Sequence, residues 1–473
     1  MYRQFIALLC FALAAGTAEA KVKLHHLVSD NMVIQAGSQA RLWGWDKPGQ
    51  TVRVSTSWSD RIYSARAAKD GSWEVKVETP AASYTPHQIT FDDGEKTTIS
   101  NVLSGEVWVC AGQSNMEMPV RGFWGCPVEG YNDVVVDSRK HSGIRYAKIP
   151  STMSMTPQKD ADTKWQVVSP ETVGWASATG YFFGRMLEDA LGVPVGLIEA
   201  NKGGSRVESW LDRANLKKNT DERLDSASIY GIETDYYRPM VWGNGTFSPI
   251  YNYTVRGIIY YQGCSNVGYH MDDYARRLGL LVDQWRREFG CGDIPFYFVE
   301  IAPYWYDNAD DTNAAILREQ QYVASTKIKN CGLVGNNDGA TKWEKKQIHP
   351  SGKRKVGERL AYYALSETYG VKGLMYKNPS MESVSVKDGK VTVKLRDTYD
   401  GMYPLSGIHG FELAGADGKF YPASAEYDWN NGITVRSTRV ADPKEVRYCF
   451  KNFMLGTARN QGGLPLLPFR AKL

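Results

Sequence analysis

The spacing of apolar and polar positions divides the chain into three stretches. Residues 21–105 hold short runs in which apolar and polar residues alternate, separated by turn signals such as Lys47-Pro48-Gly49 and Asp70-Gly71. Alternation with a period of two, punctuated by Gly and Pro, is typical of half-buried β-strands. The stretch therefore predicts a small N-terminal β-sandwich module. Its expected strands are 32–35, 40–45, 51–55, 61–67 and 72–77.

Strand-like apolar runs alternate with helical periodicity over residues 106–371. This order predicts an α/β domain with a mostly parallel sheet and helices on both faces. Ligands of such sheets bind at the carboxyl ends of the strands. A polar, aromatic insert at about 206–250 is too long for a plain connection, which favours a binding role. The expected strands are 107–110, 195–199, 255–261, 295–301 and 331–335, and the expected helices are 181–190, 274–289 and 353–369.

The pattern returns to β character over residues 372–473. The apolar runs 384–386 and 391–395 flank Lys387-Asp-Gly-Lys390, which is a strong hairpin signal. Further short apolar runs lie at 411–413, 433–435 and 446–450. We therefore expect a C-terminal β-rich module.

The first 20 residues have the composition of a secretory signal peptide. Arg3 supplies a positive charge, residues 5–15 form an apolar core, and Ala18-Glu-Ala20 is a small-residue cleavage site. We expect the mature protein to be exported, to the periplasm or the medium, after cleavage near Ala20. No later segment is apolar enough for a membrane span. The formal net charge of +4 is small for 473 residues, so no nucleic-acid partner is indicated.

Six cysteines remain after the predicted signal peptide, and none stands in a C-x-x-C pair. Their spacing therefore indicates no metal or redox motif, and we expect no cofactor. Export permits disulfides, so Cys110 and Cys126 either pair or stay as buried thiols. The oligomeric state is not defined by the sequence.

Ser114 follows the predicted strand 107–110 across two small residues, Ala111 and Gly112. Small residues permit a sharp turn, and a serine that leaves a buried strand in this way is placed as a nucleophile would be. The same local pattern also fits a polar turn with a capping serine. Segments farther along the chain favour the first interpretation.

Three later segments also fall at predicted strand ends or in the loops beyond them. Gly203 and Gly204 can bring backbone N–H groups close to a ligand oxygen, and Gln262 and Asn266 are amide donors. His349 precedes the last predicted helix, whereas the other six histidines lie in the β modules or away from strand ends. Acyl transfer needs a nucleophile, a base and oxyanion donors. We assign these roles to Ser114, to His349, and to the N–H groups of Ser114 and Gly204 with Gln262 or Asn266.

These segments, in this order, resemble the motifs of the sialate O-acetylesterase family of SGNH-type esterases. The matching motifs are Gly112-Gln-Ser-Asn-Met-Glu117, Gly203-Gly-Ser205, Tyr261-Gln-Gly-Cys-Ser-Asn266 and Ile348-His-Pro350, with Lys353 and Val356-Gly-Glu-Arg-Leu360. The resemblance covers nearly the whole mature chain. It implies an SGNH-hydrolase-like sheet sandwiched by helices between β modules. It also implies hydrolysis of acetyl esters on sugar hydroxyls without a metal or cofactor.

The resemblance also implies roles for single residues. Ser114 is then the nucleophile, His349 the base, and Gly204 with Gln262 or Asn266 the oxyanion donors. Asp338 resembles the family's aspartate upstream of the histidine motif. We expect substrate contacts from residues near these motifs and from the aromatic insert, namely Gln113, Glu117, Gly203, Trp210 and Trp242.

Two acidic positions of the family are changed in this chain. Gln347 stands where many relatives have the aspartate that holds the imidazole, and Cys264 stands where many have glutamate. An amide can orient a histidine but cannot stabilise the imidazolium. Three interpretations follow: a Ser–His dyad held by Gln347 or a backbone carbonyl, a substitute carboxylate from Glu344 or Asp338, or much reduced activity.

Three functions compete on this sequence. The first is an exported serine esterase that acts on O-acetylated sialic acids. The second keeps the chemistry but acts on acetylated hemicellulose or another acetylated glycan. The third is a non-catalytic glycan-binding protein of the same fold, because fold alone does not guarantee function. Phosphoryl transfer is disfavoured because the chain has no Gly-x-x-x-x-Gly-Lys loop.

Overall fold

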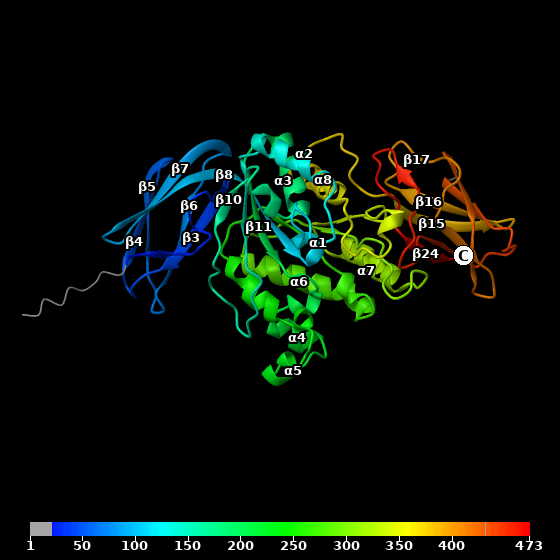
Figure 1. Cartoon of the computed structure of the whole chain (residues 1–473), viewed down its shortest axis with the longest axis horizontal. Coiled ribbons are helices and arrows are strands. Elements are labelled where there is room, and N and C mark those ends of the chain that lie inside the picture. Colours follow the sequence, from blue (N-terminus) through cyan, green and yellow to red (C-terminus); the bar gives the residue numbers. More distant parts are fainter. Residues whose placement is uncertain (1–20, 431) are drawn as a thin grey trace, which may run out of the picture.

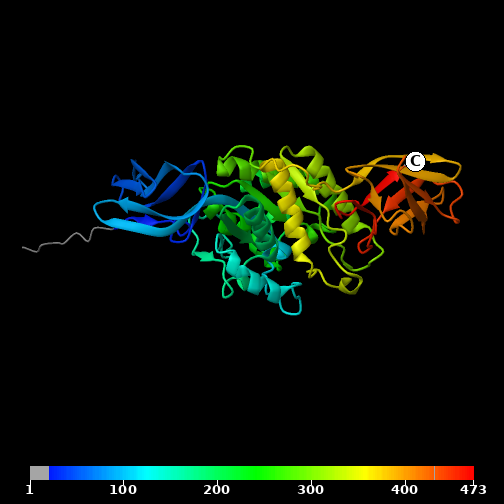
Figure 2. The same cartoon turned by 90° about the horizontal axis from the view of Figure 1, so that it is seen from above.

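The computed structural model describes residues 21–430 and 432–473, so the predicted signal peptide lies outside the described residues. Three parts follow one another along the long axis of the molecule (Figures 1 and 2). A β module stands at each end and an α/β domain lies between them. Within the described ranges, no helix is both long and apolar enough to cross a membrane.

The N-terminal module is built from β-strands, as the alternation predicted, and its pairings are antiparallel except for that of β2 with β8. β3 lies between β1 and β6, and β4 lies between β5 and β7. The prediction missed β7, because Pro86 and His87 interrupt its alternation of apolar residues. The bounds are β1 (Lys23–Leu24), β2 (Val33–Gln35), β3 (Gln39–Trp45), β4 (Thr51–Thr56), β5 (Ser59–Arg66), β6 (Ser72–Glu78) and β7 (Ser83–Asp92).

One strand, β8 (Lys96–Gly112), runs from the N-terminal module into the central domain over 17 residues. Its first part pairs with β7 and β2, and its last part, from Glu106, lies between two strands of the central sheet. The boundary that we proposed between residues 105 and 106 therefore falls inside a continuous strand. At this point a Cβ on Gly105 would collide with the Pro194 carbonyl.

The central sheet has the order β10-β9-β11-β8-β12-β13-β14, and its pairings are parallel except for that of β10. β9 and β11 lie on one side of β8, and β12 to β14 lie on the other. The order of strands thus reverses at β8, and the crevice beyond such a switch point is where ligands bind. The bounds are β9 (Ile144–Lys148), β10 (Trp165–Val167), β11 (Val195–Asn201), β12 (Gly257–Tyr261), β13 (Phe296–Val299) and β14 (Cys331–Val334).

Helices cover both faces of this sheet, as the alternation of strands and helices predicted. α3 (Ala178–Leu191) and α8 (Lys353–Tyr363) pack on the face that holds Trp108 and Cys110. α6 (Tyr274–Phe289) and α7 (Asn313–Lys327) pack on the opposite face. Successive side chains of a strand point to opposite faces, so the apolar end of β8, residues 107–111, contributes to both cores.

The helix expected at 274–289 is confirmed, and two others differ at their ends. α3 begins at Ala178 because the hydroxyl of Ser177 accepts the N–H of Gly180 at 3.0 Å and caps it. α8 ends at Tyr363 and passes into a π-helical turn, Ala364–Thr368. The sequence did not predict α7, because its buried face consists largely of alanines with Arg318 and Gln321.

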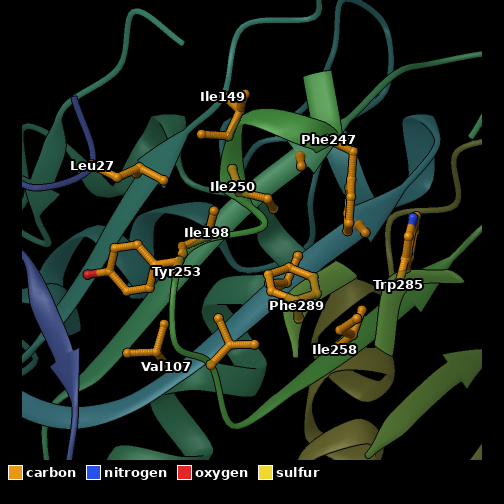
Figure 3. Close-up of a cluster of buried hydrophobic side chains, with 14 of the residues drawn as sticks. Leu27, Val107, Ile149, Ile198, Phe247, Ile250, Tyr253, Ile258, Trp285 and Phe289 are labelled. Atoms are coloured by element: carbon orange, nitrogen blue, oxygen red, sulfur yellow. The ribbon is translucent and has the colours of Figure 1, made fainter. Parts of the chain in front are cut away.

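The insert 206–250 folds onto the α6 face of the sheet. It contains α4 (Arg213–Asn219) and α5 (Ser226–Tyr230) and ends in a π-helical turn, Gly243–Phe247. The ring of Phe247 stacks on Trp285 of α6, with centroids 3.9 Å apart (Figure 3). Tyr253 and Leu27 belong to the same cluster, so this core is continuous with that of the N-terminal module.

The C-terminal module has its own core between two four-stranded sheets. Asn452 joins it to the central domain, because its side-chain oxygen accepts the N–H of Ala314 at the start of α7 (2.8 Å). The hairpin and the three later strands were predicted, whereas β17, β19, β20, β23 and β24 were not. The bounds are β15 (Ser380–Lys387), β16 (Lys390–Arg396), β17 (Met402–Tyr403), β18 (Phe411–Ala414), β19 (Phe420–Pro422), β20 (Ser424–Asp428), β21 (Gly432–Arg436), β22 (Glu445–Tyr448), β23 (Arg459–Asn460) and β24 (Phe469–Lys472).

All six cysteines of the described part are free thiols. Cys110 is buried on β8, where its sulfur faces Gly180 of α3. Cys126 lies in a loop beside Gln347. The alternative of a Cys110–Cys126 disulfide is therefore wrong.

Replacing Trp285 tests the core that joins the insert to α6. Trp285→Ala removes a fully buried ring and leaves a cavity, which costs about 3–5 kcal/mol. We expect a fall in Tm of about 6 °C or more, measured by thermal unfolding. Trp285→Phe is the matched control, because the indole Nε1 has no hydrogen-bond partner in the described structure. A Tm for Trp285→Ala equal to that of Trp285→Phe would contradict this account of the core.

Candidate active site

Ser114 lies just beyond the carboxyl end of β8, two residues after Gly112. It begins the short helix α1 (Ser114–Glu117). Gly112 has a φ of 140°, and a Cβ there would collide with the Tyr261 carbonyl of β12. The turn therefore requires glycine at this point. Within the described part of the chain, no hydrogen bond engages the Ser114 hydroxyl, so it is free to react.

The glycine loop after β11 lies against this serine. A Cβ on Gly203 would lie 3.4 Å from the Cβ of Ser114, and the Glu117 carboxylate accepts the Gly203 N–H at 2.7 Å. Gly204 has a φ of 79°, and the Tyr236 ring occupies the place of its missing side chain. No acceptor among the described residues takes the N–H of Ser114 or of Gly204. Two backbone donors are thus left for a ligand oxygen.

The amides of Gln262 and Asn266 do not join these donors, which corrects our expectation. Gln262 Nε2 donates to the Ser205 carbonyl (3.1 Å) and to Asn266 Oδ1 (2.9 Å). Asn266 Nδ2 donates to the buried carboxylate of Glu208 at 3.0 Å. Both side chains are buried. They support the glycine loop from below, since their donors are already engaged inside the protein.

Gln113 also has a positioning role. Its side chain is buried, and its Oε1 accepts the N–H of Gly263 at 2.9 Å. This bond ties the end of β8 to the loop after β12. Gln113 therefore holds two segments of the site together rather than presenting its amide to a substrate.

Trp210 and Trp242 do not present their rings to a substrate either. Trp210 is fully buried and donates its Nε1 to the Ser205 hydroxyl at 3.0 Å. Trp242 is 3% exposed and donates to the Asp235 carbonyl at 3.2 Å. Sequence reasoning chose them as tryptophans in a polar insert. It missed Trp124, which is 100% exposed two residues before Cys126.

His349 is brought to Ser114 by the residues next to each of them. Asn115 Nδ2 donates to the Ile348 carbonyl at 3.0 Å. The ammonium group of Lys353 donates to Asn115 Oδ1 (2.7 Å) and to the Pro350 carbonyl (2.8 Å). Lys353 is buried, and burial lowers its pKa to about 7. These bonds hold the histidine loop against α1.

A tight turn, residues 123–126, flanks the imidazole. Phe123 and Cys126 exchange backbone hydrogen bonds, and the Phe123 ring lies edge-on to His349 with centroids 5.2 Å apart. The Cys126 thiol donates to Gln347 Oε1 at 3.4 Å, and its sulfur lies 3.9 Å from His349 Nδ1. Burial, with a smaller effect from the charge of Lys353, lowers the pKa of His349 to about 4.

No carboxylate in the described structure bonds to this imidazole. The two oxygens of Glu344 accept the N–H groups of Thr341 and Ser351, each at 2.8 Å. Asp338 forms a two-point ion pair with Arg359 at 2.7 and 2.9 Å. The substitute carboxylates that we considered are therefore engaged elsewhere. Gln347 is not bonded to the ring, because its Oε1 accepts the backbone N–H of His349 at 3.0 Å.

The arrangement thus combines a free hydroxyl, a histidine that is neutral at pH 7 and two backbone donors at one sheet edge. These are the groups that acyl transfer uses. Over residues 21–430 and 432–473, no group of three or more His, Cys, Asp or Glu side chains is placed to hold a metal ion.

Comparison with known proteins agrees with this chemistry. The family model "Carbohydrate esterase, sialic acid-specific acetylesterase" matches residues 104–366. Sialate O-acetylesterase of Homo sapiens is 27% identical over 388 residues, covering 76% of this chain and 73% of that protein. The Mus musculus enzyme of the same name is 26% identical over 451 residues, covering 84% and 82%.

A solved structure shares the whole architecture. A carbohydrate acetylesterase from Xanthomonas citri superposes with a TM-score of 0.83 at 28% sequence identity. The superposition covers 95% of this chain and 99% of that one. The similarity therefore includes both β modules as well as the α/β domain.

Lys353→Met tests the buried lysine that ties the histidine loop to Asn115. The folded-state pKa of Lys353 is lowered, so between about pH 7 and pH 10 the unfolded chain binds more protons. Stability from this group therefore rises with pH across that window. We expect the Tm of the wild type, relative to that of Lys353→Met, to increase from pH 7 to pH 10. A Tm difference that is constant over this range would contradict a lowered pKa.

Proposed function

This chain belongs to the sialic acid-specific acetylesterase family of carbohydrate esterases, and we propose that it removes acetyl groups from O-acetylated sialic acids as a serine esterase. Membership makes it a carboxylic ester hydrolase. The observation that carries the mechanism is the free Ser114 hydroxyl, with Gly203 so near on one side that a Cβ there would meet Ser114, and with the His349 loop tied to the neighbouring Asn115 on the other.

The reaction follows from these positions. His349 takes the proton from Ser114 as its oxygen attacks the acetyl carbonyl carbon, and the N–H groups of Ser114 and Gly204 receive the resulting oxyanion. The C–O bond to the sugar then breaks, and His349 returns the proton to the leaving sugar oxygen. Water repeats the sequence on the acetyl-serine and releases acetate.

We propose that the reaction runs on a Ser–His dyad. The Cys126 sulfur lies 3.9 Å from His349 Nδ1, and its thiol donates to Gln347 Oε1. The sulfur can therefore accept the Nδ1 proton weakly and hold the ring, without the charge that a carboxylate would supply. A histidine in this setting stays neutral at pH 7, which is the form required of a base.

Export and domain organisation complete the proposal. The charged, apolar and small-residue segments of positions 1–20 support export after cleavage near Ala20. We divide the mature chain into a β module at 21–105, a catalytic domain at 106–371 and a β module at 372–473. The residues that carry the chemistry all belong to the second of these.

The first experiment measures acetate release from 4-nitrophenyl acetate, an O-acetylated sialic acid and an acetylated xylo-oligosaccharide. We expect wild-type turnover of the sialic acid ester, and a loss on the order of 10⁴-fold or more in Ser114→Ala and His349→Ala. Turnover of the xylo-oligosaccharide alone would reassign the substrate to hemicellulose. Binding of sugar without turnover of any ester would contradict the esterase and favour a glycan-binding protein.

The pH dependence of kcat/KM tests the dyad. With the pKa of His349 near 4, the wild type keeps its activity down to about pH 5 and loses it as the imidazole becomes protonated. Gln347→Asp adds a negative charge that favours the imidazolium, so the acid limb moves toward neutral pH while turnover at pH 8 is kept or raised. Gln347→Asn, which has the shape of aspartate without its charge, is the control. Equal profiles for these two variants would refute the electrostatic role.

A further inference from the structure

One arginine beside the catalytic loop is held in place but has free donors. The guanidinium of Arg206 lies between the rings of Tyr237 and Tyr269, with its central carbon 3.8 and 3.5 Å from their centroids. Its Nε donates to the Ser265 carbonyl at 3.1 Å. Within the described structure, its two terminal nitrogens meet no carboxylate and no other acceptor. Because both faces of the guanidinium are covered by aromatic rings, only its edge, with the two terminal nitrogens, can reach a ligand.

Contacts on two sides connect Arg206 to the residues that flank Ser114. Arg206 follows Gly204 by two residues. Tyr236, which directly precedes the stacking partner Tyr237, lies against Gly204. On the other side, Ser265 also lies 3.5 Å from the amide of Gln113, which directly precedes Ser114. The guanidinium therefore belongs to the rim of the acyl site rather than to a separate surface.

The nearby carboxylates are bonded to other groups, so Arg206 is not part of a structural ion pair among the residues that the structure describes. Glu208 is bonded to Arg277 at 2.8 Å and to Asn266, and Glu222 accepts the Tyr269 hydroxyl at 2.8 Å. Arg238 of the same insert gives a useful contrast. It stacks on Tyr230, but its donors engage the Ile232 and Tyr230 carbonyls.

We propose that Arg206 binds the carboxylate of the sugar whose acetyl ester Ser114 cleaves. A planar guanidinium with two free terminal nitrogens matches the two oxygens of a carboxylate, which a neutral hemicellulose lacks. The aromatic rings on either side hold the fork in the required plane before the ligand arrives. This inference rests on the proposed function and names the residue that selects the acidic sugar.

The test compares a carboxylated sugar with its own methyl ester. Titration calorimetry measures the Kd of free sialic acid and of sialic acid methyl ester for the wild type, Arg206→Gln, Arg206→Lys and Arg238→Gln. A charged hydrogen bond predicts that the wild type binds the acid about 10- to 100-fold more tightly than the methyl ester. Arg206→Gln should bring the two Kd values together, and Arg206→Lys should fall between, because it keeps the charge but loses the fork. Arg238→Gln should keep the wild-type ratio.

Kinetics on the O-acetylated acid and its methyl ester then give the same ratio in kcat/KM. Equal affinity of the wild type for acid and methyl ester would overturn the inference, and so would an unchanged ratio in Arg206→Gln. A variant that unfolds is recognised by its Tm, and the more conservative Arg206→Lys then decides. Since the binding ratio needs no turnover, failure of Arg206 to select the acid is distinguishable from failure of the chain to hydrolyse esters.

Discussion

The architecture of the whole molecule depends on strand β8, which is confined between the neighbouring strands β11 and β12 of the central sheet. β8 begins in the N-terminal module and ends at Gly112, two residues before Ser114, and over its last residues it lies between β11 and β12. Because of this confinement, positions 105 and 112 must be glycine. The chain turns out of the sheet at Gly112, just before Ser114. A reactive hydroxyl at a fixed place is thus a consequence of backbone packing, because a side chain at Gly112 would push β12 away.

Buried hydrogen bonds, rather than a carboxylate, position the histidine. Asn115 joins Ile348 and Lys353 across a long separation in sequence, so the loop that carries His349 is tied to the residue after Ser114. Such bonds are costly to leave half-made in a buried site, which keeps the loop in one position. Because no aspartate of the described chain lies beside the imidazole, no negative charge favours its protonated form, and burial keeps the ring neutral. In the dyad that we propose, the orientation of the histidine comes from these hydrogen bonds, and no acid supplies a charge to it.

The insert contributes its aromatic residues in two different ways. Trp210 and Phe247 are inside, where they fill the space against α6 and hold the Ser205 hydroxyl from below. Tyr236 and Tyr237 lie beside the glycine loop: Tyr236 lies against Gly204, and Tyr237 holds Arg206 together with Tyr269, which lies beyond the insert. Large aromatic rings gain most from burial, so the tryptophans that look suited to sugar stacking are used for the core. The selectivity that we propose comes instead from an arginine that these rings orient.

The sequence by itself determined the class of fold and the edge of the sheet at which the chemistry lies. Period-two and helical patterns are local properties, so the N-terminal strands, α6 and the strand before Ser114 could be predicted directly. The alanine-faced α7 and the Pro-containing β7 could not, because their burial depends on what packs against them. Only the tertiary structure decided which polar groups remain free. Gln262, Asn266, Glu344 and Asp338 looked suited to catalysis, yet each is bonded to partners distant in sequence or across a loop. Cys126 and Arg206 carried no local signal, since their roles arise from contacts with His349, Tyr237 and Tyr269, which three-dimensional packing alone brings together.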